Sequence, residues 1–352
     1  MDDTRFVREI LAQPAALETV VDYYTADLGR GLLRDAARII RAARRVIVTG
    51  MGTSLHTPYL LRKELGGSVP CLEILDAGEL LHFGLDTFRG DEVVIAVSQS
   101  GESAETRQVV EKLKGKAPII SVLNNPDSSM AGNSDQVLLL LAGEEASISA
   151  KTYTNTLALF FLLSAAVKGE NTDETAAHLH ELSRIMEENM EKVYEMAVRA
   201  ADFFVPLPHL HFVARGSDLV SAAQGALILK EGASIFTEAL SGGLFRHGPI
   251  ELAGEGHSIM FIATQGNKPH LTLNLAVETA ALGSRTAVLA DRKTAGELSA
   301  PGLLSLSLEC PAPRFFPILC APFLEFFVHE TAERKGREAG VFRHAAKITA
   351  RE

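Results

Sequence analysis

The sequence predicts an α/β protein made of two tandem three-layer α/β/α sandwiches with parallel sheets, preceded by a helical lead-in. Two observations carry this prediction. Short apolar runs rich in β-branched residues alternate with helical patterns, and the whole series of strand, loop and helix occurs twice. Continuous apolar strands are typical of parallel sheets that helices cover on both faces. The 352 residues also exceed one ordinary domain.

The expected division follows the changes of pattern along the chain. Leu17, Val20, Val21 and Tyr24 lie at spacings of three and four, so the first residues form the helical lead-in. The predicted parts are a lead-in at 1–45, a first sandwich at 46–170, a connecting helix at 171–205, a second sandwich at 206–330 and a C-terminal tail at 331–352.

Each sandwich is expected to contain four strands. Those of the first are predicted within 46–48, 93–97, 119–123 and 137–141. Those of the second are predicted about 165 residues later, within 212–214, 259–263, 286–289 and 304–308. Spacing and order are both repeated, so the two halves are expected to share one architecture.

Composition excludes several classes of partner. The formal net charge is -10 and no run of Lys and Arg occurs, so nucleic acid is not an expected partner. Cys71, Cys310 and Cys320 have no CxxC spacing, which predicts reduced core residues rather than disulfides or a thiolate metal site. Without a basic and apolar leader, and with Thr156–Val167 too short to span a bilayer, we expect a cytoplasmic protein without a membrane partner.

Two polar loops follow predicted strands of the first sandwich. Gly50-Met51-Gly52-Thr53-Ser54 follows the first strand, and Ser98-Gln99-Ser100-Gly101-Glu102-Ser103 follows the second. Ligands of open parallel sheets bind beyond the carboxyl ends of the strands, where loops lead into helix N-termini. Hydroxyl groups, backbone N–H groups and the helix dipole suit a phosphate. The alternative is that these serines only cap helices.

The chain resembles the sugar isomerase (SIS) family, in particular the isomerase domain of glucosamine-6-phosphate synthase. The resemblance rests on Gly52-Thr53-Ser54, on Ser98 to Ser103, on Leu229-Lys230-Glu231 and on Arg246-His247-Gly248-Pro249. It extends from Arg8-Glu9-Ile10 and Gln13-Pro14 to Ala346-Lys347-Ile348-Thr349, so it covers nearly the whole chain in order.

The resemblance implies a sugar phosphate as ligand and a homodimer that shares its active site. The implied catalytic residues are Glu231 as the proton-transferring carboxylate, His247 of the neighbouring subunit for ring opening, and Lys347 for imine formation with an open-chain ketose. The implied substrate-binding residues are Gly52, Thr53, Ser54, Ser98, Gln99, Ser100, Ser103, Ser149 and Ala346.

General chemistry is consistent with these implied roles. One carboxylate can move a proton between neighbouring carbons, histidine titrates near neutral pH, and lysine attacks a carbonyl only as the neutral amine. Arg343 and His344 are near enough in sequence to lower the pKa of Lys347. The alternatives are a solvated surface charge for Glu231, a turn cap for His247 and a mobile terminal residue for Lys347.

The expected function is that of an amino-sugar phosphate isomerase or deaminase acting on a 2-amino-2-deoxy aldose 6-phosphate or ketose 6-phosphate. Ile228 and Gln224 stand where the synthase has lysine and glutamate, so the substrate contacts differ. A fructosamine-phosphate deglycase is therefore the first alternative, and a non-catalytic sugar-phosphate sensor the second.

No cofactor and no catalytic metal are expected. The sequence shows no N-terminal glutaminase domain, so glutamine is not an expected ammonia source. Histidines occur in i,i+2 pairs, His178 with His180 and His209 with His211, but no His-Glu-x-x-His pattern or cysteine partner accompanies them.

Overall fold

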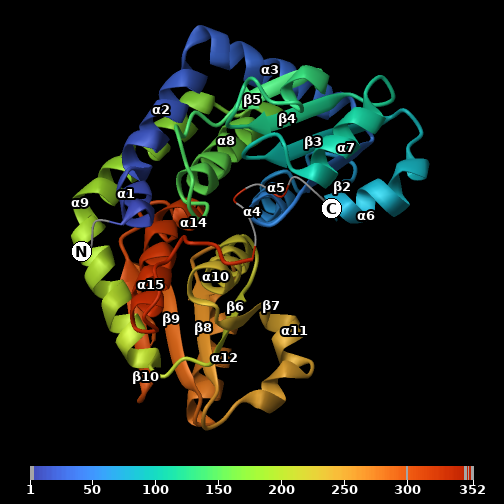
Figure 1. Cartoon of the computed structure of the whole chain (residues 1–352). Coiled ribbons are helices and arrows are strands. Elements are labelled where there is room, and N and C mark those ends of the chain that lie inside the picture. The colour runs from blue at the N-terminus through green and yellow to red at the C-terminus, as the bar shows by residue number, and fades with distance from the viewer. Residues whose placement is uncertain (1–3, 299, 345–346, 348, 350–352) are drawn as a thin grey trace. The chain divides into compact units, whose positions relative to one another are not determined.

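The computed structural model describes residues 4–298, 300–344, 347 and 349. They form two compact units (Figure 1). The first unit consists of Gln13–Ser183 with the described part of Phe342–Glu352, and the second of Arg184–Val341 with the described part of Met1–Ala12. The C-terminal tail therefore belongs to the unit built from the N-terminal half of the chain.

The first unit contains a five-stranded parallel sheet in the order β2-β1-β3-β4-β5. Its strands are β1 (Arg45–Gly50), β2 (Leu72–Asp76), β3 (Glu92–Ser98), β4 (Ile119–Leu123) and β5 (Gln136–Leu139). Every residue of β3 and β4 is buried, as expected of central strands that are covered on both faces.

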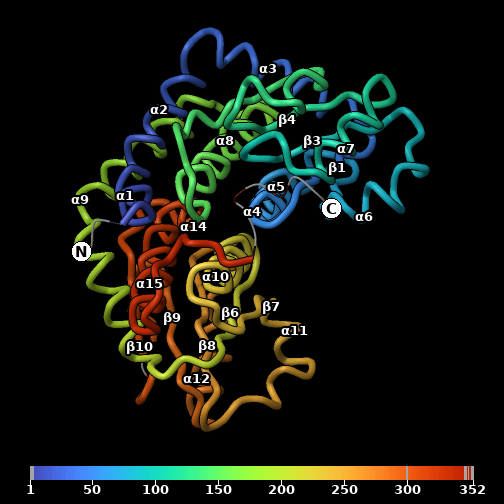
Figure 2. The backbone as a smooth tube through the Cα atoms, in the orientation of Figure 1, coloured from blue at the N-terminus to red at the C-terminus, as the bar shows by residue number. Residues whose placement is uncertain are grey.

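The second unit contains a second five-stranded parallel sheet, in the order β10-β9-β8-β6-β7. Its strands are β6 (His209–Ala214), β7 (Phe236–Ser241), β8 (Ser258–Ala263), β9 (Arg285–Asp291) and β10 (Leu303–Leu308). Numbered within each unit, both sheets have the order 2-1-3-4-5, so the topology is repeated. Figure 2 traces the first sheet from blue to green and the second from yellow to red.

Helices surround both sheets, which confirms the predicted α/β fold and helical N-terminal segment. The helices of the first unit are α2 (Gln13–Thr25), α3 (Asp27–Ala42), α4 (Thr53–His56), α5 (Pro58–Glu64), α6 (Ala77–Glu79), α7 (Ala104–Leu113) and α8 (Lys151–Lys168), with the short turns η1 (Leu80–Gly84), η2 (Leu85–Thr87) and η3 (Ala131–Asn133). Helix α9 (Thr172–Phe204) continues from the first unit into the second.

The helices of the second unit are α1 (Arg5–Leu11), α10 (Asp218–Ala233), α11 (Gly242–Arg246), α12 (Pro269–Ala281), α13 (Arg292–Gly296), α14 (Phe316–Leu319) and α15 (Ala321–Glu333), with η4 (Pro249–Leu252) and η5 (Pro313–Phe315). The stretch Pro313–Glu333 is long and apolar enough to cross a membrane, but its most apolar window is buried inside the fold. It is therefore a core segment by its burial.

The sequence prediction missed β2 and β7, the two strands at equivalent edges of the sheets. Each contains a charged residue, Glu73 in β2 and Glu238 in β7, and each is only partly buried. Natural edge strands often carry charges, which prevent pairing with other chains. Such strands do not stand out in the sequence as continuous apolar runs.

Helices α10 and α11 cover opposite faces of the second sheet. The Cα of Gly225 in α10 lies against the ring of Phe212, since an added Cβ would come within 3.0 Å of it. Phe245 of α11 instead packs in the core cluster with Val213 and Phe261. Because Phe212 and Val213 are consecutive in β6, they point to opposite faces.

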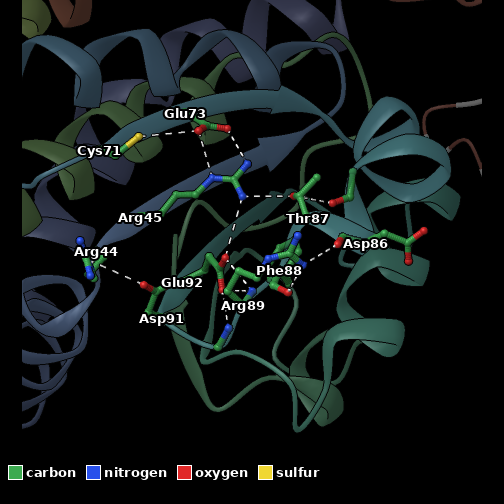
Figure 3. Close-up of polar contacts among 12 residues, drawn as sticks. Arg44, Arg45, Cys71, Glu73, Asp86, Thr87, Phe88, Arg89, Asp91 and Glu92 are labelled. Carbon is green, nitrogen blue, oxygen red and sulfur yellow. Dashed lines mark hydrogen bonds and ion pairs between the residues drawn. The ribbon is translucent and has the colours of Figure 1, made fainter.

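An ion-pair network lies at the end of the first sheet where its strands begin (Figure 3). The Arg45 guanidinium donates to both Glu73 oxygens, at 3.0 and 2.7 Å, and lies 3.9 Å from Glu92. The Glu92 carboxylate accepts the N–H groups of Arg89 and Gly90. Burial alone would raise the pKa of Glu92, but these backbone hydrogen bonds lower it overall.

The three cysteines are free thiols, as predicted. Their predicted place in the core is right for Cys320, which is buried, and wrong for Cys71, which is exposed. Cys71 directly precedes the edge strand β2, which explains its exposure.

Candidate functional site

The loop that follows β3 forms a tight, internally hydrogen-bonded turn. The Ser98 hydroxyl accepts the Gly101 N–H over 3.1 Å and lies 3.3 Å from the Ser103 hydroxyl. The Ser100 hydroxyl accepts the Glu102 N–H over 3.1 Å. Gly101 has φ +69° and lies against Ser128, which an added Cβ would approach to 2.2 Å. Only glycine fits this position.

The turn after β1 lies beside this loop, because β1 and β3 are neighbours in the sheet. A Cβ on Gly50 would lie 2.8 Å from the Val97 carbonyl oxygen. Gly52 then has φ 55° and precedes α4, so Thr53 and Ser54 form its first turn. In the order 2-1-3-4-5, the gap between these two strands is the topological switch point, where such sheets bind ligands.

The structure brings the described part of the C-terminal tail to the same loop. The N–H of Ala104, the first residue of α7 after Ser103, donates to the Thr349 carbonyl oxygen over 3.0 Å. Lys347, two residues earlier, places its Nζ 3.1 Å from Oε2 of Glu145. Lys347 is partly buried rather than a solvated terminal residue, since 19% of its side chain is exposed.

Glu145 is a buried carboxylate at the N-terminus of α8. Its side chain has no exposed surface, and Oε1 accepts the N–H groups of Ala150 and Thr152, each over 3.0 Å. Oε2 accepts the Thr152 hydroxyl over 2.6 Å as well as the Lys347 ammonium. A carboxylate at a helix N-terminus is stabilised by the helix dipole, so Glu145 is a fixed anion that positions the lysine.

Sequence reasoning missed Glu145 and its neighbour Lys151. Lys151 is the first residue of α8, is largely buried, and donates from Nζ to the Glu144 carbonyl oxygen over 2.7 Å. The available signal was an acidic residue between a predicted strand and a predicted helix, which is typical of a helix N-terminus. Ser149, which the resemblance implied, lies in this same segment.

The equivalent turn of the second unit is already filled by a side chain. After β6, the buried Asp218 accepts the Thr264 N–H over 3.0 Å, the Thr264 hydroxyl over 2.8 Å and the Asn267 amide over 2.8 Å. This internal carboxylate takes the donors of the loop after β8. The first unit, with hydroxyl groups at its switch point, is therefore the better candidate for binding an external anion.

Glu231 and His247 both belong to the second unit. Glu231 lies near the end of α10 and is exposed, while His247 is the C-cap of α11 and is also exposed. Because α10 and α11 cover opposite faces of the sheet, the structure does not bring these two side chains of one chain together. Gln224 and Ile228, which share the α10 face with Glu231, are buried.

The structure therefore groups part of the predicted site. Within the first unit it brings together Thr53, Ser54, Ser98, Gln99, Ser100, Ser103 and Lys347 at one edge of the sheet or beside it. The predicted contact Ala346 lies outside the described residues.

Comparison with known families identifies the family of this chain. The family described as SIS domain matches residues 39–168 and 205–295, more than half of the chain. The chain belongs to the SIS domain family. Each sheet of this SIS protein lies largely inside one matched segment.

Individual relatives of this SIS protein point to phosphosugar enzymes. It is 28% identical over 347 residues to the glutamine--fructose-6-phosphate aminotransferase (isomerizing) of Sulfurisphaera tokodaii, covering 97% of this chain and 55% of the relative. It is similarly 28% identical to the enzyme of that name from Pyrobaculum aerophilum, covering 97% of this chain and 56% of the relative. The chain thus spans about half the length of these curated relatives.

Solved structures support the fold of the SIS protein. The C-terminal domain of glucosamine-fructose-6-phosphate aminotransferase from Francisella tularensis matches with a TM-score of 0.86 at 23% identity, covering 96% of this chain and 98% of that one. Glucosamine-6-phosphate deaminase from Thermotoga maritima matches with a TM-score of 0.77 at 18% identity, covering 98% and 99%.

Proposed function

We propose that this SIS protein is an enzyme that interconverts a 2-amino-2-deoxy aldose 6-phosphate with a ketose 6-phosphate and ammonia, as a deaminase, or that catalyses the related aldose–ketose isomerisation. The observation that carries the proposal is the approach of the tail to the serine loop, Ser98 to Ser103, in the first unit. Hydroxyl groups in this loop can bind the phosphate of an open-chain ketose phosphate. A lysine amine can form a bond to its carbonyl carbon.

The serine loop would bind the phosphate. Ser98, Ser100 and Ser103 supply hydroxyl groups at the end of a central strand, and the Gly101 turn fixes their backbone. Hydroxyl and backbone donors bind phosphate well where a loop enters a helix. The N–H of Ala104 is already taken by Thr349, so the side chains would provide most of the contacts.

Lys347 would attack the ketose carbonyl. Its neutral amine would add to the C2 carbonyl carbon and expel water, which gives an imine. The attack requires the neutral amine, so the lysine proton has to leave first. Ammonia would then displace the lysine amine from C2, which frees Lys347 and leaves an imine of ammonia on the sugar. Glu231 would move a proton from C1 to C2 of this imine to give the 2-amino aldose, because a carboxylate can both accept and return a proton. Deamination is the reverse sequence.

His247 would open the sugar ring, and a second copy of the chain would supply it. Its position on the face opposite to Glu231 supports this part of the proposal. Leu244 of α11 and Leu252 of η4, which lie on either side of His247 in sequence, are exposed apolar side chains. Exposed apolar residues that gather in this way are typical of a protein interface. The occupant we propose is the second subunit of a homodimer.

A fructosamine-phosphate deglycase is the second candidate. Ile228 and Gln224 are buried beside Glu231, where the synthase is expected to have lysine and glutamate. A different lining would suit a substrate with a different nitrogen substituent. The cytoplasmic location stays a prediction.

A panel assay tests the proposal. Purified protein is incubated with glucosamine 6-phosphate, fructose 6-phosphate with ammonia, and fructosamine 6-phosphates, and ammonia, free amino acid and ketose phosphate are measured. Ammonia release or aldose–ketose conversion that Glu231→Gln abolishes, while phosphosugar binding persists, is the expected result. Release of an amino acid would favour the deglycase. Saturable binding without product from any substrate would mean a sensor.

A further inference from the structure

Three histidines and a glutamate lie on or beside neighbouring strands of the second sheet, at the end of the sheet where these strands begin. His209 and His211 belong to β6, Glu238 to β7, and His257 immediately precedes β8. His211 pairs with Glu238 in the register of β6 and β7, and with Ile259 in that of β6 and β8. Two residues back along both strands, His209 lies beside His257, and their rings stack at 5.3 Å.

Two imidazole nitrogens of this cluster face each other. Nδ1 of His211 lies 2.8 Å from Nε2 of His257. The other nitrogen of each ring has its own polar neighbour, since Nε2 of His211 lies 3.5 Å from Glu238 and Nδ1 of His257 lies 3.5 Å from the Ser284 hydroxyl. At 2.8 Å one of the two facing nitrogens donates a hydrogen bond to the other. A metal ion bound to both nitrogens would displace this proton, because each ligand has to offer its lone pair.

The first sheet has the same topology as the second but different residues at the positions equivalent to this cluster. There the registers pair Arg45 with Glu92 and Ile47 with Glu73. The equivalent positions are therefore Arg45 and His209, Ile47 and His211, Glu73 and Glu238, and Glu92 and His257. In the first sheet a permanent cation, Arg45, lies between the two carboxylates (Figure 3).

The second sheet keeps one carboxylate of this set and replaces the arginine by an imidazole. We propose that a divalent transition metal ion of the zinc class binds here, with His211 Nδ1 and His257 Nε2 as ligands. His209 is the third ligand after a rotation of its side chain, and Glu238 positions His211 from the far side of its ring. The ion supplies the positive charge that Arg45 provides in the first sheet.

Burial and charge at this cluster suit such an ion. Only 12% of the His211 side chain is exposed, and burial lowers its pKa. Burial, together with the neighbouring imidazoles, lowers the pKa of His257 to about 4. Both rings are thus neutral at pH 7, as metal ligands have to be.

A cavity of about 1080 Å³ opens onto the cluster and leaves room for further ligands of the ion. The three histidines, Glu238 and Glu255 line the cavity. Lys230 of α10 also lines it and has a positive charge, like the ion. For zinc–nitrogen bonds of about 2.0–2.1 Å, two ligand nitrogens in a tetrahedral site lie roughly 3.3 Å apart. The rings therefore separate by roughly half an ångström when the ion enters.

A second group of ligand atoms provides the control. Among the described residues, Glu18, Asp22 and His180 place one ligand atom each within 4.8 Å of one another. These side chains are more exposed and already pair with each other, His180 Nδ1 with Glu18 at 2.6 Å. Carboxylates hold a zinc-class metal less well than imidazoles do, and this group has two carboxylates and one imidazole, so it is not the proposed site.

The test is metal binding by the tag-free full chain after chelator treatment. Titration calorimetry with Zn²⁺ is expected to give one site per chain. His211→Ala and His257→Ala should each weaken binding by at least about tenfold, Glu238→Gln by about tenfold, and His180→Ala by less than twofold. Loss of binding in His180→Ala with retention in His211→Ala would overturn the proposal, as would no Zn²⁺ binding by the wild type.

A spectroscopic measurement keeps the test valid if a histidine variant fails to fold. Wild-type protein loaded with Cu²⁺ should show electron paramagnetic resonance splitting from at least two imidazole nitrogens, and His180→Ala should show the same splitting. Oxygen-only coordination, or splitting from a single nitrogen, would contradict the site. This inference is independent of the proposed function, because neither measurement uses substrate.

Discussion

The Lys347 amine lies 3.1 Å from Oε2 of Glu145, a carboxylate with no exposed surface. In the proposed mechanism this amine attacks the ketose carbonyl, which it can do only in its neutral form. This relationship gives the most direct test of the role proposed for the tail.

Lys347→Arg should keep the ion pair with Glu145 but lose turnover by about 10³-fold or more, because a guanidinium does not provide a neutral amine. Product formation and phosphosugar binding are measured together, and binding should change little. Lys335→Arg, at another lysine near the C-terminus, should keep turnover within about twofold. An arginine variant at 347 with a tenth or more of wild-type turnover would exclude imine formation by Lys347.

Mixing two inactive variants tests the shared active site. Glu231→Gln and His247→Ala should each be inactive alone. After unfolding and refolding together, about a quarter of the sites should pair an intact Glu231 with the intact His247 of the other chain, as in a two-fold symmetric dimer. Recovery of activity is compared with each variant refolded alone. No recovery, with dimers present by light scattering, would place both residues in one chain's site.

Gly101→Ala should distort the serine loop. The φ of +69° and the Ser128 hydroxyl at 2.2 Å from an added Cβ together predict a loss of about 2–4 kcal/mol of unfolding free energy, and weaker phosphosugar binding. Gly115→Ala is the control, since Gly115 has φ +74° and no atom within 4 Å of the added Cβ. It should cost only about 1 kcal/mol and leave binding unchanged. Equal effects of the two substitutions would mean that the contact with Ser128 is unimportant.

Glu92→Gln should make the free energy of unfolding depend less on pH between pH 7 and pH 3. The folded state lowers the pKa of Glu92, so its carboxylate stabilises the fold above its unfolded pKa, and this contribution is lost as the pH falls through the folded pKa. At pH 7 the variant should lose about 1–3 kcal/mol in urea unfolding, and the difference from wild type should shrink toward pH 3. Asp91→Asn removes an exposed carboxylate beside it and should cost less than about 0.5 kcal/mol. A Glu92 effect that is constant across this pH range would be inconsistent with the lowered pKa.

Much of the fold could be predicted because the central strands are continuous apolar runs. Val93 to Val97 and Ile119 to Leu123 are buried on both faces, so local sequence alone identifies them. The edge strands β2 and β7 contain charged residues and expose part of their surface, and their pairing depends on a neighbour far along the chain. Local pattern does not contain that information.

The candidate site could also be predicted only in part. The serine loop is contiguous in sequence and follows a strand, so its place at the sheet edge could be inferred. Glu145 and Lys347 are far apart in sequence, and only the fold brings them together. His257 likewise reaches His209 and His211 only because the parallel strands β6 and β8 are neighbours in the sheet, whereas the sequence shows only the pair His209 and His211.

The exchange of terminal segments between the two units has a consequence for how this protein is made. During translation Glu145 leaves the ribosome 202 residues before Lys347, the amine that reaches it. Until Lys347 follows, Glu145 is a carboxylate without this counter-ion. A nascent chain that has not yet reached Lys347 therefore has the Ser98–Ser103 loop without this lysine, so the proposed imine formation has to wait until Lys347 has joined the first unit.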